Sequence, residues 1–485
     1  MIRSLCLVTT ALLGLAAIPS AGHAADVQPG RTAALLQKLL AFDTSNPPGD
    51  TKALAEFLKT QFEPLGAEVD VIPTPQQPGP VHFIARLKGD GSKPPLLIAA
   101  HSDVVPVERS HWSVDPFAGV IKDGYVFGRG AMDFKGGLAV FAAAALMLAE
   151  NKVPLARDVI FLSEADEEAG DYGTDWLAEN HWDKINAEFA LNEGGWIFQD
   201  DGGVARQVNV TTRDKVYLTL KLSATGTPTH SSRPSLPKDS AIGRLSLALA
   251  RIAASDTDPK LNDQTRGYFE ALARSAGEPL ASRIKTLTDA QDPEARRKAG
   301  EEIVAAGAYP LLWHALMRDT IAITMLEGGI KENVIPGSAS ALVNMRLVPG
   351  STLDDAIGEV RAIIQDPDIE ITVPAYPSLD AAREAIAKRT ADAASPTDTD
   401  LYTSLAANAK AVWPQAEVVP ALFEAGTDAV AWRSRGIPVY GIYPYPLDNE
   451  TLLRMHGNDE RIGVDALDQG TEWVYRTLVE VAGKK

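Results

Sequence analysis

Residues 159–170 read VIFLSEADEEAG, and this stretch holds the pattern that decides the fold. The apolar run at 159–162 is short and rich in branched side chains, as the buried strands of parallel sheets are. Four carboxylates follow within five positions: Glu164, Asp166, Glu167 and Glu168. Carboxylates this close repel one another and are costly to desolvate at a strand end. We therefore expect a positive charge to compensate them.

The same order of apolar run and polar residues recurs along the chain. Helical patterns at 137–148 and 174–180 separate the apolar runs at 95–100, 159–163 and 189–192. Strands that alternate with helices indicate βαβ units and a mostly parallel sheet. In an open α/β sheet, ligands bind outside the carboxyl ends of the strands.

A different texture begins after about residue 212. Strand patterns at 216–224 and 341–347 alternate with period two, and helical patterns cover 241–254 and 353–364. We therefore predict two domains. One is α/β (25–212 and 378–485), with helices on both faces of a mostly parallel sheet. The other is a smaller inserted α+β unit (213–377) with an antiparallel sheet and two helices, and it carries a charged helical insertion at about 256–318.

Residues 1–24 have the order of a secretory signal peptide. A positive charge at Arg3 precedes an apolar core at 5–18, which is too short to span a bilayer, and small residues follow at 21–24. No other apolar run is long enough for a membrane span, so we expect a periplasmic or secreted protein without membrane attachment after cleavage. The net charge of -18 argues against nucleic acid or an anionic membrane as partner.

The single cysteine, Cys6, lies inside this signal. Any metal must therefore be bound by His, Asp and Glu. Such residues follow the apolar runs at 95–100, 159–163 and 189–192, and another precedes the helix at 137–148. They are His101, Asp133, Glu167, Glu168 and Glu193. If the runs are neighbouring strands, these groups converge and form a divalent-cation site.

His101 and Asp103 stand two positions apart in extended chain, so their side chains point the same way. We predict that Asp103 accepts the second imidazole N–H and thereby orients His101 as a metal ligand.

Four segments together resemble the metallopeptidase family M20. They are HSDVVPV (101–107), HWSVDPFAGVIKDGYVFGRGAMDFKGG (111–137), SEADEEAG (163–170) and LNEGG (191–195). The resemblance runs from about residue 33 to about 465. The size of the insertion and the form of the first segment are most similar to the carboxypeptidase S and N-acyl-amino-acid hydrolase branch.

The resemblance implies two zinc ions per subunit, with Co²⁺ or Mn²⁺ as alternatives, because oxygen-rich sites with two histidines accept several metals. His101 and Glu193 would hold one ion, Glu168 and His456 the other, and Asp133 would bridge them. His82, His111, His181 and His314 match no ligand position of the family.

Glu167 is then the carboxylate of its pair that binds no metal, and it would act as general base, with Asp103 as a second catalytic residue. The resemblance also implies that the inserted domain serves as lid or dimerisation domain. Its His230, in TGTPTHSSRPS (225–235), would reach an active site, often that of a dimer partner, and stabilise the oxyanion.

Four further positions would bind substrate: Asn333, Arg346, Gly426 and Thr427. The guanidinium of Arg346 matches a free carboxylate with two parallel hydrogen bonds. The family often holds an acid two residues before this arginine, whereas this chain has Asn344, so we expect Arg346 to be less firmly oriented. Asp428 is expected to cap the helix that follows it.

These features predict a zinc-dependent, exo-acting amidohydrolase, a metallocarboxypeptidase or dipeptidase. It would cleave the peptide or N-acyl amide bond of a C-terminal amino acid with a free carboxylate. An aminoacylase-type hydrolase of N-acyl amino acids is the nearer alternative, because only the acyl pocket would differ. A non-catalytic metal-binding or ligand-binding protein is the distant one, and Glu167 argues against it, since binding needs no unligated carboxylate beside a ligand. The subunit could act alone or as a homodimer joined through the inserted domain.

Overall fold

Apolar residues fill consecutive positions of the central strands, and they bury both faces of the sheet that these strands form. The computed structural model describes residues 28–75, 79–170, 172–200, 202–236, 239–391 and 393–484. The predicted signal peptide lies outside these residues. The eight-stranded sheet has the order β1 (Glu68–Pro73), β2 (Val81–Leu87), β6 (Val159–Glu164), β3 (Leu96–His101), β7 (Phe189–Gln199), β16 (Val439–Leu447), β8 (Ala205–Asp214) and β15 (Glu417–Phe423).

The centre of this sheet is parallel. β3 runs parallel to both β6 and β7, β16 runs parallel to β7, and β15 runs parallel to β8. β1 and β2 are antiparallel additions at one edge, and β8 is antiparallel to β16 and β7. The carboxyl ends of β6, β3 and β7 therefore lie side by side.

Helices cover both faces of the sheet. Leu96 and Ile98 pack into a core with helices α1 (Arg31–Leu40), α2 (Lys52–Phe62), α3 (Lys135–Glu150), α13 (Asp400–Val412) and α16 (Val464–Ala482). Leu97 and Ala99, which point to the opposite face, pack with α4 (Thr174–Asn180), α5 (Trp182–Ile185) and α14 (Val430–Arg433). The 3-10 helix η1 (Glu63–Leu65) follows α2 directly.

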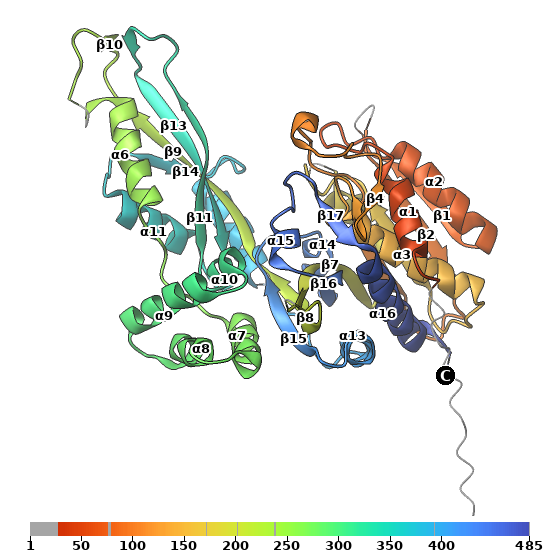
Figure 1. Ribbon diagram of the computed structural model, residues 1–485. Coiled ribbons are helices and arrows are strands. Elements are labelled where there is room, and N and C mark those ends of the chain that lie inside the picture. The colour runs from red at the N-terminus through yellow and green to blue at the C-terminus, as the bar shows by residue number, and fades with distance from the viewer. Residues whose placement is uncertain are drawn as a thin grey trace, which may run out of the picture.

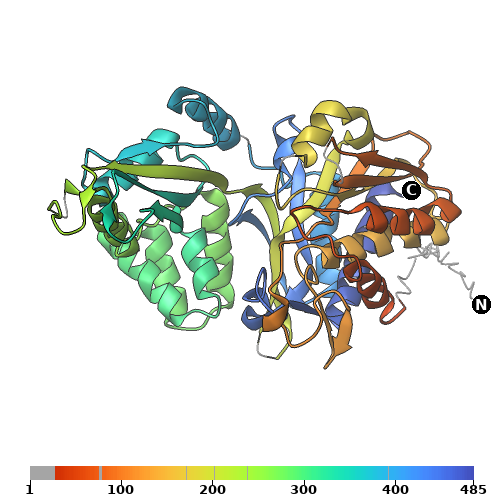
Figure 2. The same ribbon diagram turned by 90° about the horizontal axis from the view of Figure 1, so that it is seen from above.

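A second, antiparallel sheet forms a separate lobe (Figure 1). Its order is β11 (Thr320–Gly328), β13 (Ser338–Leu347), β9 (Val216–Thr225) and β14 (Glu370–Thr372). Helices α6 (Ala241–Ala253) and α11 (Leu353–Ile364) pack against one of its faces, and α12 (Leu379–Ala391) completes that core. Figure 2 shows the two lobes side by side. The mixed α/β class with separate antiparallel sheets is confirmed, whereas the domain boundaries stay a prediction.

The helical insertion packs on the larger sheet as well. It comprises α7 (Asp263–Ser275), α8 (Leu280–Asp289), α9 (Pro293–Ala306) and α10 (Pro310–Leu316). A capping box between Asn262 and Thr265 starts α7, which then contacts the edge strand β15. Tyr268 and Phe269 of α7 belong to the same core as the eight-stranded sheet. The insertion therefore extends the core on the side of the sheet that β7, β8 and β15 form.

Small elements complete the described chain. β17 (Arg461–Gly463), β5 (Tyr125–Phe127) and β4 (Val120–Lys122) form a three-stranded sheet, and β10 (Thr229–His230) pairs with β12 (Val334–Ile335). The 3-10 helix η2 (Arg109–His111) and helix α15 (Asn449–Leu452) lie in loops. Among the described residues, no helix combines the length and the apolar character that crossing a membrane requires.

Candidate metal centre and active site

Three neighbouring strands bring the predicted ligands together. His101 is the last residue of β3, Glu193 lies on β7, and Glu167 and Glu168 stand in the loop directly after β6. Asp133 comes from the turn before α3. The alternation of strands and helices therefore places these side chains at one edge of the sheet, as the sequence predicts.

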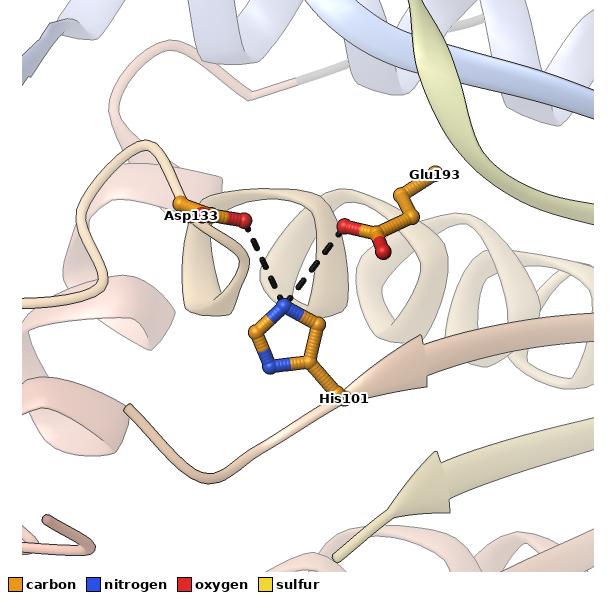
Figure 3. Close-up of side chains that lie close together, drawn as sticks. All are labelled: His101, Asp133 and Glu193. Carbon is orange, nitrogen blue, oxygen red and sulfur yellow. Dashed lines mark hydrogen bonds and ion pairs between the residues drawn. The ribbon is translucent and has the colours of Figure 1, made fainter. Parts of the chain in front are cut away.

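His101 lies between two carboxylates (Figure 3). Its Nε2 is 3.3 Å from Asp133 Oδ1 and 3.5 Å from Glu193 Oε2. All three side chains are buried. Figure 3 shows Asp133 and Glu193 directed at the same imidazole nitrogen from different sides.

His456 completes a second group around the other oxygen of Asp133. Its Nε2 is 2.9 Å from Asp133 Oδ2 and 3.4 Å from Glu168 Oε1. The two oxygens of Asp133 thus face two different histidines. This is the arrangement that a bridging carboxylate needs.

The donor set fits metal ions. Ligand atoms of His101, Asp133 and Glu193 lie within 4.8 Å of one another, and so do those of Asp133, Glu168 and His456. Glu168 Oε1 is buried without a hydrogen-bond partner, although it faces an imidazole nitrogen. An orphaned carboxylate oxygen among further carboxylates is costly unless a cation compensates it. Histidine and carboxylate side chains are suitable ligands for such a cation.

The pKa values of these groups also indicate an excess of negative charge at the site. Burial, reinforced by the negative charge of Glu193, raises the pKa of Glu167 well above its ordinary value. The hydrogen bond to Asp133 and the nearby carboxylate of Glu168 raise the pKa of His456 to about 10. Burial would raise the pKa of Asp133, but hydrogen bonds from His101 and His456 hold it below its ordinary value. The excess of negative charge is therefore offset by imidazolium groups, whose protons a bound metal ion would replace.

Asp103 contacts both the first histidine and the loop after β6. His101 Nδ1 is 3.0 Å from the main-chain oxygen of Asp103 and 3.5 Å from its Oδ1, so the carbonyl is nearer than the predicted carboxylate. The carboxylate instead accepts the main-chain N–H groups of Glu167 and Glu168, at 3.3 and 3.1 Å. Asn46 also donates to it, at 2.8 Å. Asp103 therefore orients the two acids as well as the imidazole.

Tyr443 is a neighbour of the ligands that the sequence did not reveal. Its hydroxyl lies 2.9 Å from Asp133 Oδ1 and 3.2 Å from Glu193 Oε2. Trp196 stacks on its ring at 4.0 Å. Tyr443 lies on β16 within the apolar stretch VYGIYPYPL, where a buried tyrosine reads as ordinary core.

A cleft of about 560 Å³ joins this group to the smaller lobe. Glu167, Glu168 and His456 line one part of it, and Arg346 and Tyr217 of the antiparallel sheet line another. The loop that holds Gly426 and Thr427 lines it as well. The structure thus brings the predicted base, several ligands and three of the four predicted substrate contacts to one cavity.

Arg346 is oriented by an aromatic ring. Its guanidinium lies over Tyr217, 4.6 Å from the ring centroid. Asn344, at the position of the missing acid, donates to Thr219 Oγ1 at 3.2 Å, and Thr219 in turn donates to the hydroxyl of Tyr217 at 3.0 Å. The Tyr217 ring therefore supports the Arg346 side chain without neutralising the positive charge of its guanidinium.

His230 and Asn333 lie away from this cleft. Both are exposed at the tip of the smaller lobe, where β10 pairs with β12 (Figure 1). Ser231 N–H donates to the carbonyl of Asn333 at 3.1 Å, and His230 Nδ1 is 2.9 Å from Ser232 Oγ. The structure therefore brings these two residues close to one another but not to the metal-binding group of their own chain.

The loop after β15 differs from the prediction in one respect. Asp428 does not cap α14, which has no side-chain cap. Thr427 Oγ1 instead accepts the N–H of Ala429 at 3.2 Å and donates to Asp214 Oδ2 at 2.6 Å. Asp428 accepts a hydrogen bond from Thr174 at 2.6 Å, which directs its carboxyl group away from the start of the helix.

Comparison with known proteins agrees with this geometry. Residues 97–480 match the family described as Peptidase family M20/M25/M40. Probable carboxypeptidase S-like 2 of Dictyostelium discoideum is 30% identical over 80% of this chain and 72% of its own. N-fatty-acyl-amino acid synthase/hydrolase PM20D1 of Mus musculus is 27% identical over 82% of this chain and 76% of its own.

A solved structure of the same family shares the fold. The crystal structure of the M20 family metallo-carboxypeptidase Sso-CP2 from Sulfolobus solfataricus superposes with a TM-score of 0.66 at 19% identity, covering 93% of this chain and 99% of that one. The profile match spans most of the chain, and the ligand geometry described above lies within it. The chain therefore belongs to peptidase family M20/M25/M40 and is a hydrolase of amide bonds.

Proposed function

We propose that the chain is a dizinc, exo-acting amidohydrolase that cleaves the peptide or N-acyl amide bond of a C-terminal amino acid with a free carboxylate. The observation that carries this proposal is the position of Arg346. Its guanidinium has no ion-pair partner among the residues that the structure describes, and it lines the same cleft as Glu167 and His456. A positive group that is buried in part and left unpaired is suited to a carboxylate of the substrate.

His101 and Glu193 would hold one ion, Glu168 and His456 the other, and Asp133 would bridge them. Two Zn²⁺ ions, with Co²⁺ or Mn²⁺ as alternatives, would supply Lewis acidity for the scissile carbonyl and lower the pKa of water.

Glu167 would move the proton. Its raised pKa suits a group that takes a proton from the attacking water and returns it to the leaving nitrogen. Asp103 holds the backbone of Glu167 through a 3.3 Å hydrogen bond, so the base keeps a fixed position. Arg346 would bind the carboxylate of the leaving amino acid. Gly426 lies beside it: a Cβ atom there would be 3.6 Å from Arg346 Nη1, an ordinary van der Waals contact.

His230 and Asn333 would act across a homodimer. Both are exposed at the tip of the smaller lobe, where β10 pairs with β12, so a second copy of the chain can reach them. We propose that the tip of one subunit delivers His230 to the oxyanion in the other.

The nearer alternative is an N-acyl-amino-acid hydrolase, which the name of the mouse relative favours. The chemistry at the bond is the same, and Arg346 would read the same carboxylate. The signal-like order of residues 1–24 supports a periplasmic or secreted enzyme, and N-terminal sequencing of the mature protein tests this.

A panel of substrates tests the proposed function. It holds dipeptides, their C-terminal amides, and N-acyl amino acids with short and long acyl chains, each assayed with zinc-loaded enzyme. Glu167→Gln is the inactive variant, and Glu179→Gln, an exposed glutamate on α4, is the matched control. We expect cleavage of free acids, little cleavage of amides, and loss of activity only in Glu167→Gln. Metal binding without turnover of any panel member would contradict the proposal.

A further inference from the structure

A buried ion pair lies beside the metal-binding group, and its two partners come from distant parts of the chain. Arg129 stands four residues before Asp133, and Glu460 stands four residues after His456. The side chains are 3% and 0% exposed, and Arg129 Nη1 is 2.5 Å from Glu460 Oε2. A buried ion pair is seldom a net source of stability, because desolvation offsets the attraction. Its presence here calls for another reason.

The second carboxylate oxygen of Glu460 binds the backbone at Asp133, the proposed bridging ligand. Oε1 accepts the main-chain N–H of Met132 at 2.8 Å and that of Asp133 at 3.0 Å. The backbone from which the Asp133 carboxylate projects is thereby fixed.

The second terminal nitrogen of Arg129 binds the backbone at His456, another proposed ligand. Nη2 donates to the carbonyl of His456 at 3.2 Å and to that of Gly457 at 2.8 Å. His456 has a φ of 57°, a conformation that costs a residue with a Cβ about 1 kcal/mol or more. The guanidinium is one of the groups that hold the loop in this conformation.

We propose that Arg129 and Glu460 are positioning residues for the metal centre, which set the separation between Asp133 and His456. The ion pair lies at the end of the pairing between β5 and β17, where the two segments leave the sheet towards Asp133 and His456. The other hydrogen bonds of Arg129 and Glu460 described above go to the backbone at or next to these two residues. Without the pair, His456 Nε2 and Asp133 Oδ2 would no longer be held 2.9 Å apart. The inference rests on the proposed dinuclear site, because the affected site is the one formed by Asp133, Glu168 and His456.

The chain offers a matched control. Arg157 and Glu188 form another ion pair of a buried arginine, at 2.7 Å, and Glu188 N–H bonds to Pro95 at the opposite end of the strands. Arg157→Met should lower thermal stability without any effect on the metal centre, and by less than Arg129→Met does, because Glu188 is exposed and Glu460 is fully buried.

The experiment is a calorimetric titration of the metal-free full chain with Zn²⁺ in the presence of a competing chelator, for wild type, Arg129→Met, Glu460→Gln and Arg157→Met. We expect two ions in wild type. Loss of groups that orient metal ligands typically weakens metal affinity ~10–100-fold, so Arg129→Met and Glu460→Gln should weaken one ion by that factor. Arg157→Met should leave both affinities within about threefold. The double variant of Arg129 and Glu460 should lose no more than the worse single variant, since both act through one contact.

Arg129→Lys keeps the inference testable if Arg129→Met does not fold. A lysine retains the charge opposite Glu460 but lacks the fork that reaches both carbonyls, so its loss of affinity should lie between wild type and Glu460→Gln. The inference is overturned if Arg129→Met binds two ions with wild-type affinity, or if the single variants Arg129→Lys and Glu460→Gln both do so. This outcome leaves the dizinc proposal standing. Wild-type protein that binds fewer than two ions overturns the dizinc proposal and this inference together.

Discussion

Replacement of Arg346 by methionine separates recognition of the substrate carboxylate from catalysis. Methionine keeps much of the side-chain volume and can still lie on Tyr217, but it removes the positive charge. Because Arg346 forms no ion pair with any described residue, its loss leaves no protein carboxylate unpaired. The entire effect should therefore fall on the substrate.

Hydrogen bonds to charged groups contribute about 1.5–3 kcal/mol each. The cleft is open to water, so we take about 3 kcal/mol for both bonds of the fork together, which corresponds to about 150-fold in kcat/KM. The assay compares one dipeptide with its C-terminal amide. We expect Arg346→Met to lose about 150-fold on the acid and less than about threefold on the amide, so that the preference for the acid disappears. Equal losses on both substrates, or a loss below about fivefold on the acid, would refute the assignment.

Three further predictions follow from the same geometry. Removal of metal by a chelator should destabilise the chain, since saturation to 100 times Kd contributes about 2.7 kcal/mol per site; urea unfolding with and without Zn²⁺ measures this, and equal stability would count against a metal centre. Burial lowers the pKa of His82 to about 4, below its value in the unfolded chain, so stability is present above about pH 6.5 and lost as the pH falls towards 4. Wild type should lose roughly 3 kcal/mol more than His82→Gln between pH 7 and 4, and parallel pH profiles would contradict this. Tyr217→Phe keeps the ring under Arg346 and should change KM less than about threefold, whereas Tyr217→Ala should raise KM for free acids by about 5–10-fold, the ~1 kcal/mol of a cation–π contact; identical KM values for the two variants would exclude a role of the ring.

Much of the fold could be read from short patterns. The apolar run before Glu167 and Glu168 predicts a buried strand, and its repetition predicts a parallel sheet whose strand ends carry the ligands. That inference needs only local sequence, because the carboxyl ends of neighbouring parallel strands lie together. His456 could be placed only through the family resemblance, since nothing in the spacing links it to Asp133.

Other features depended on packing between segments far apart in the chain. Tyr443 is surrounded by apolar residues in the sequence, and only the fold shows that its hydroxyl faces two predicted ligands, Asp133 and Glu193. Asp428 has the position of a helix cap, yet its carboxylate accepts a hydrogen bond from Thr174, which lies 254 residues away in the sequence. The support of Arg346 by Tyr217 depends on the pairing of β13 with β9, which sets Arg346 opposite Tyr217 and which no local pattern encodes.

The burial of α3 has a consequence for biosynthesis. Fourteen consecutive residues of this helix, from Lys135 to Leu148, are buried, and the element that covers much of it is α16, near the end of the chain. A ribosome makes α3 more than 300 residues before Trp473 and Leu478 of α16 reach it. During that interval only the part of α3 that packs on α1, β3 and β6 can be covered, and the part that faces α16 stays open. A nascent chain that stops at residue 463 lacks α16, so the last helix to be synthesised completes the cover of α3.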